Sequence, residues 1–145
     1  MALELGDSTF RPLLRDDIIS AWEVEQIHYD PPAVPGTASV LPRAFLQLGN
    51  IDAGEKRGLT RTVLFHTYTI AGQFPFPEEG TLEEAKVARV NELLAVLTAG
   101  GTIYESVWRY RFDGVDFETS RTTDDEAEDY YTVMITFSLE WVTGV

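Results

Sequence analysis

The fold is decided by the stretch Tyr131-Thr-Val-Met-Ile-Thr-Phe-Ser-Leu-Glu-Trp141, in which large apolar residues alternate strictly with smaller or polar ones. This period of two predicts a β-strand with one face in the core and the other polar or turned toward a partner. At about 3.3 Å per residue the strand would span roughly 40 Å, enough to cross a whole domain.

Working outward from this strand, similar patterns predict four more strands. We expect them at Val40–Gly49, Arg61–Phe74, Ile103–Phe112 and Val115–Thr119. Between the last two, Asp113-Gly114 has the composition of a two-residue hairpin turn. Two polar segments, Asn50–Thr60 and Ser120–Asp129, are predicted to be loops.

The clearest helix is predicted at Thr81–Ala99. Thr81 followed three residues later by Glu84 forms a capping box, and Gly100 ends the pattern. One stripe of the helix is apolar, as expected of a helix that packs across a sheet. The residues of that stripe are Leu82, Val87, Val90, Leu93, Leu94 and Leu97.

A second helix is predicted at Arg11–Glu23, near the N-terminus. Ser8 or Thr9 would cap it, and Asp16 and Asp17 would face water between the apolar residues. The segment 30–36 then holds three prolines and predicts an extended connector, read either as a plain loop or as an arm lying on a neighbouring subunit.

Together these elements predict one α+β domain over residues 1–145, in the order α-β-β-α-β-β-β. Its sheet, mixed or antiparallel, would have about five strands, with the long helix packed on one face.

The amino-acid composition excludes several classes of function. The 145 residues include 24 acids against 11 bases, a formal net charge of −13, and no cysteine. Such a surface repels nucleic-acid phosphate, so we do not expect a nucleic-acid reader. Without cysteine there is no disulfide framework, thiolate zinc site or cysteine nucleophile. The chain also lacks an apolar run long enough for a membrane span, so we expect it to be built in a cytosol and to have no membrane partner.

The two histidines do not predict a catalytic or metal site. His66 lies within a predicted strand and is expected to be a packed or hydrogen-bonded core residue. His28 and Asp30 are two possible metal ligands without a third nearby. We therefore predict no catalytic residues, metal or cofactor.

The acids are unevenly distributed along the chain. Residues 113–129 hold eight acids and one base, Arg121. We expect this acidic hairpin or loop to be solvated, and its acids to line a lumen or a rim in any assembly. They are Asp113, Asp116, Glu118, Asp124, Asp125, Glu126, Glu128 and Asp129.

Several aromatic residues and arginines are candidates for contacts with other subunits or partners, because both residue types are enriched at interfaces. The alternatives are a row of core aromatics beside cross-strand ion pairs, and phenylalanines that cap the core. The candidates are Phe74, Phe76, Trp108, Arg109, Tyr110 and Arg111.

The chain as a whole resembles the tail terminator, or tail completion, proteins of long-tailed bacteriophages and related particles. The resemblance is in the order of elements. It runs from an N-terminal helix and proline-bearing connector to Leu41–Gly49, then Tyr68–Gly72, the capped helix with Glu92–Leu97, and finally Asp129–Phe137. No functional residue is transferred by it.

The resemblance implies a virion structural protein rather than an enzyme. Its subunits would assemble in the host cytoplasm into a ring, commonly of six, that caps the tail tube, ends its polymerisation and joins the tail to the head connector. The partners would be further copies of the chain, the tail tube protein and the connector or neck proteins, with DNA passing through without specific binding.

Other functions fit the same residues. One is an acidic monomeric module that mimics DNA, which would need acids spaced along an elongated face. Another is a different component of the head–tail connector or neck. The third is an enzyme that uses carboxylates and His66 in a cup formed by the sheet.

Overall fold

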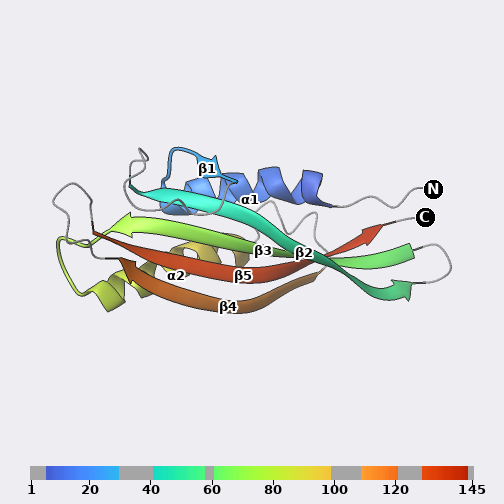
Figure 1. The fold of residues 1–145 in the computed structure, drawn as a ribbon. Coiled ribbons are helices and arrows are strands. Elements are labelled where there is room, and N and C mark those ends of the chain that lie inside the picture. Colours follow the sequence, from blue (N-terminus) through green and yellow to red (C-terminus); the bar gives the residue numbers. More distant parts are fainter. Residues whose placement is uncertain (1–5, 30–40, 58–60, 99–108, 121–128, 144–145) are drawn as a thin grey trace.

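The computed structural model describes residues 6–29, 41–57, 61–98, 109–120 and 129–143. Within them are two helices, α1 (Asp7–Trp22) and α2 (Leu82–Thr98), and one sheet (Figure 1). The strands are β1 (Ile27–His28), β2 (Arg43–Arg57), β3 (Arg61–Pro75), β4 (Arg109–Ser120) and β5 (Tyr130–Thr143). The predicted α+β class, with a five-stranded sheet, is confirmed.

The strands lie in the order β1-β2-β3-β5-β4. β1 pairs with β2 in parallel, and the other neighbours are antiparallel, so the sheet is mixed. β5 lies between β3 and β4, and its ladder with β3 extends from Thr62↔Thr143 to Pro75↔Tyr130. The stretch 131–141 therefore forms a long strand, as its alternation predicts. Its polar side was expected to be solvated or turned toward a partner, but Thr132, Ser138 and Glu140 on that side are buried.

Two predicted breaks are strand instead. The element order is α-β-β-β-α-β-β, because the short strand β1 was not predicted and the strands predicted on either side of Asp113-Gly114 are one strand, β4. The polar segment Asn50–Thr60 was predicted to be a loop, but residues 50–57 continue β2 and pair with β3. The predicted turn at Asp113-Gly114 is a register shift within β4, between Phe112 and Gly114. One extra residue there forms a β-bulge, because β5 offers a continuous partner strand on which β4 carries on. The proline-rich connector at 30–36 lies outside the described residues.

Both helices pack on the same face of the sheet. The core contains inward-facing residues of β2, β3 and β5 together with one side of each helix. From α1 these are Phe10, Leu14, Ile18 and Trp22, and from α2 they are Val90, Leu93 and Leu97. Trp22 packs closely on the sheet because Gly72 has no side chain, since a Cβ there would lie 2.6 Å from the Trp22 ring.

The helix boundaries differ slightly from those predicted. α2 begins as expected, with the Glu84 backbone N–H donating to Thr81 Oγ1 over 3.2 Å. α1 begins at Asp7 after Gly6 and has no side-chain cap, so neither Ser8 nor Thr9 caps it. Asp17 is 8% exposed, whereas it was predicted to face water. Val87 was predicted in the apolar stripe of α2, but it is 53% exposed.

Candidate interaction surface

Strand β4 forms one edge of the described sheet and is bonded to β5. Phe112, Val115 and Phe117 stand beside Phe137, Ile135 and Val133 of β5, which belong to the core. All three therefore lie on the helix-bearing face. The bulge at Asp113 is what keeps Phe112 in phase with the two apolar residues that follow it.

The apolar row of β4 is only partly covered. Val115 packs against the core, but Phe112 is 41% exposed and Phe117 is 42% exposed. An edge strand with two half-exposed phenylalanines offers both backbone hydrogen-bonding groups and apolar area to another chain.

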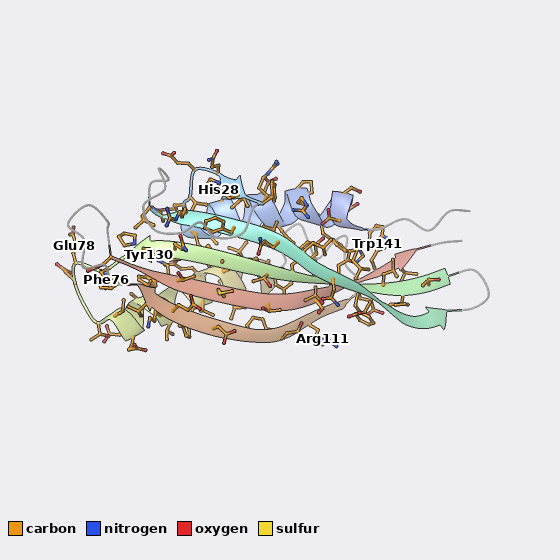
Figure 2. The ribbon with its side chains drawn as sticks, viewed as in Figure 1. His28, Phe76, Glu78, Arg111, Tyr130 and Trp141 are labelled. Carbon is orange, nitrogen blue, oxygen red and sulfur yellow. The ribbon has the colours of Figure 1, made fainter. Side chains whose placement is uncertain are left out.

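The opposite face of β4 is charged, and near the start of the strand Arg111, which is labelled in Figure 2, forms an ion pair with Asp113. Arg111 Nε donates to Asp113 Oδ1 over 2.9 Å, and the Ser138 hydroxyl donates to Asp113 Oδ2 over 2.8 Å. The Arg111 side chain is still 65% exposed. Its guanidinium carbon lies 5.9 Å from the centre of the Phe65 ring.

The predicted acidic residues fall into two groups. Asp113, Asp116 and Glu118 lie along β4, and Asp129 directly precedes β5; all four residues are exposed. Asp124, Asp125, Glu126 and Glu128 lie outside the described residues. A lumen or rim position for these acids stays a prediction.

The predicted contact residues differ in how far they are buried. Phe74 is fully buried against Trp22 and Tyr131, with the Arg89 guanidinium 4.4 Å from its ring centre, so it has no surface to offer a partner. Phe76 is partly buried against the core. Trp108 lies outside the described residues, and of Arg109 and Tyr110 only the strand position is described. Arg111 is exposed, and its role in contacts with a partner stays a prediction.

His66 is a buried core residue, as predicted. Its Nε2 accepts a hydrogen bond of 3.0 Å from the Gly6 backbone N–H at the start of α1. Because Nε2 is the acceptor, the neutral ring carries its proton on Nδ1. Burial lowers the pKa of His66, and the nearby charge of Asp7 offsets only part of that effect. His66 therefore ties α1 to β3.

Asp7 connects this helix start to the sheet. It accepts a 2.7 Å hydrogen bond from the Tyr68 hydroxyl and is also bonded to Arg11 at 3.0 Å. Burial raises the pKa of Asp7, but the hydrogen bonds from Arg11 and Tyr68 outweigh it, so the pKa lies below its ordinary value. The same burial, with the Asp7 contact, raises the pKa of Tyr68. These groups stabilise the junction of α1 with the sheet.

Among the described residues, no group of three or more histidines, aspartates and glutamates is arranged to hold a metal ion. None of the described helices is long and apolar enough to span a membrane.

The exposed Phe112 and Phe117 were not singled out by sequence reasoning. Their signal is the alternation of apolar and charged residues from Arg111 to Glu118, and Asp113-Gly114 interrupts it. Treating that dipeptide as a bulge rather than a turn brings out a single amphipathic strand.

No protein-family model matches the chain, and no curated protein matches it. Among solved structures, it is similar to a chain in the virion of a native gene transfer agent (GTA) particle. The two are 14% identical with a TM-score of 0.36, and the match covers 88% of this chain and 84% of the other. At that distance the likeness carries no inference about function.

Proposed function

We propose that this protein is a structural subunit of a phage-like particle, a tail terminator without enzymatic activity. Six copies form a ring that caps the tail tube, ends its polymerisation and joins the tail to the head connector. The proposal starts from the resemblance in the order of elements and draws support from the surface of the sheet.

The observation that carries the proposal is the charge on the described sheet face away from the helices. Its middle is uncharged, with Thr67, Thr69 and Thr136 partly exposed, whereas Thr132, Ser138 and Glu140 on the same face are buried. Along β4 it carries the exposed acids Asp116 and Glu118, and the exposed Arg111 is already paired with Asp113. A wall of this kind repels phosphate rather than binding it, which suits a passage for DNA.

The proposal is tested by native mass spectrometry and electron microscopy of the purified chain. We expect a ring with six times the 16.3 kDa mass of the chain, which binds the end of isolated tail tubes. A chain that stays monomeric at high concentration and never associates with tail tubes would contradict it.

A further inference from the structure

We propose that two copies of this chain associate through the edge strand β4, which pairs antiparallel with β4 of the second copy about a two-fold axis near Val115. The two sheets then become one, with the helices of both copies on the same face. This pairing does not depend on the proposed ring and is an association of its own, because a two-fold contact does not join neighbours in a ring whose two ends differ.

The first support is the register of the apolar row. When Phe112 of one copy stands opposite Phe117 of the other, symmetry places Phe117 opposite the second Phe112. In each copy the same four residues, 113–116, separate the two rings, so the two strands match in length between the ring pairs, and the bulges of both copies lie beside the two-fold axis. The pairing covers the two half-exposed rings of each copy, and aromatic cross-strand pairs stabilise antiparallel strands.

The second support is the direction of the backbone groups. Phe112 and Phe117 stand beside Phe137 and Val133 of β5, positions four residues apart. In an antiparallel ladder the residues that bond to one side recur every two positions. Phe112 and Phe117 are thus in phase, as opposite partners in a second ladder must be.

The third support is charge complementarity in the same register. The residue before Phe112 is Arg111 and the residue after Phe117 is Glu118, so the pairing sets each Arg111 opposite the partner's Glu118. Both side chains lie on the exposed, charged face of β4. The same register sets Asp113 opposite the partner's Asp116, and this like-charge pair opposes the association. The opposition is reduced because the Asp113 carboxylate is already paired with Arg111 and bonded to Ser138.

The register can be tested by reversing charges. Arg111→Glu sets two acids opposite each other, and Glu118→Arg sets two arginines opposite each other. By symmetry each change occurs twice in the dimer, so we expect each variant to weaken dimerisation by about tenfold or more in sedimentation equilibrium.

Mixing the two single variants is the decisive experiment. In the mixed dimer both contacts are again between opposite charges, so we expect heterodimers to form more strongly than either homodimer. The double variant R111E/E118R should likewise dimerise with itself. Within one chain the two residues stand opposite Ser138 and Thr132, six positions or about 20 Å apart along β5, so contact inside the chain does not explain such a rescue.

Glu79→Arg is the matched control, because Glu79 is exposed and lies before α2 rather than on β4. It makes the same change in charge as Glu118→Arg and should leave dimerisation unchanged. Melting curves of all variants show whether each remains folded.

A wild-type chain that is monomeric at every concentration would overturn the pairing. So would single variants that stay folded and dimerise as strongly as wild type, or a mixture without rescue. A dimer that never grows into a ring supports the pairing and contradicts the proposed function. A ring that forms equally well from both single variants, without rescue in the mixture, supports the proposed function and contradicts the pairing.

Discussion

Asp17 is a carboxylate on the buried side of α1, and its Oδ2 has no hydrogen-bond partner among the described residues. Burial raises the pKa of Asp17, and the neighbouring charge of Asp16 raises it further. The ionised carboxylate therefore costs stability in the folded state.

Replacing Asp17 with Asn removes that charge with little change in shape. We expect Asp17→Asn to increase the free energy of unfolding at pH 7 by about 1 kcal/mol. The gain should shrink as the pH falls toward 4, because the native Asp17 then takes up a proton. Urea titrations measure both effects. Asp16→Asn, at an exposed position, is the control and should change stability less; equal effects would contradict the assignment.

His66 has the opposite dependence on pH. Its folded pKa lies below the ordinary value of 6.5, so below that pH the unfolded chain binds the proton more readily. The stability that His66 contributes is complete above pH 6.5 and is lost as the pH falls, by at most about 1.4 kcal/mol per pH unit.

We expect His66→Gln, which retains an acceptor for Gly6 but does not titrate, to lose less stability than wild type between pH 7 and pH 5.5. Thermal melts at these pH values measure the difference. If wild type and the variant lose the same amount, burial of a neutral His66 is not what makes the fold sensitive to acid.

At the scale of elements, α2 offers a matched pair of core substitutions. Leu93 is fully buried and Leu94 is only partly buried. We expect Leu93→Ala to cost about 2–5 kcal/mol, because it leaves a cavity in the core, and Leu94→Ala to cost clearly less. Chemical denaturation measures both. A larger loss of unfolding free energy for Leu94→Ala than for Leu93→Ala would mean that α2 turns a different face toward the core.

Strands β4 and β5 should differ in hydrogen exchange. β5 has a bonded neighbour on both sides, whereas β4 is at the edge. We expect the amides of 131–141 to exchange slowly, and alternate amides of β4 to exchange fast in the monomer. Dilution should speed exchange at those outward amides if two copies pair there. Equal protection of β4 and β5 in a monomer would contradict the edge position.

The elements show how far the sequence predicts this fold. Strict alternation in β5 and the Thr81–Glu84 capping pattern are local signals, and both elements form where those signals lie. Residues 50–57 of β2 and the bulge of β4 depend on pairing with other strands rather than on local sequence. Because β3 and β5 supply continuous ladders, polar residues 50–57 and the Asp113-Gly114 pair are held in extended structure against their local preference.

The candidate surface was predictable only in part. Sequence reasoning found the acids and Arg111 of β4 but missed Phe112 and Phe117 as exposed residues. Exposure of these rings depends on how far the helices extend over the edge of the sheet, which is a property of packing. In the same way, the burial of Asp17 depends on tertiary packing and cannot be predicted from its neighbours in the sequence.

At the scale of the whole molecule, charge opposes assembly. Each copy has a formal net charge of −13, so copies repel one another over roughly 10 Å at 0.1 M salt. We expect self-association to strengthen as salt rises from low to physiological ionic strength, because screening reduces this repulsion more than it weakens the apolar contacts of β4. Light scattering across a salt series measures the trend. Association that weakens steadily with salt would show that attraction between opposite charges dominates.

The start of α1 meets the end of β5. A Cβ at Gly6 would lie 2.8 Å from the Trp141 ring, and the Gly6 backbone is bonded to His66 of the neighbouring strand. Fluorophores attached just before Gly6 and just after Trp141 would therefore sit side by side and transfer energy efficiently in every folded copy.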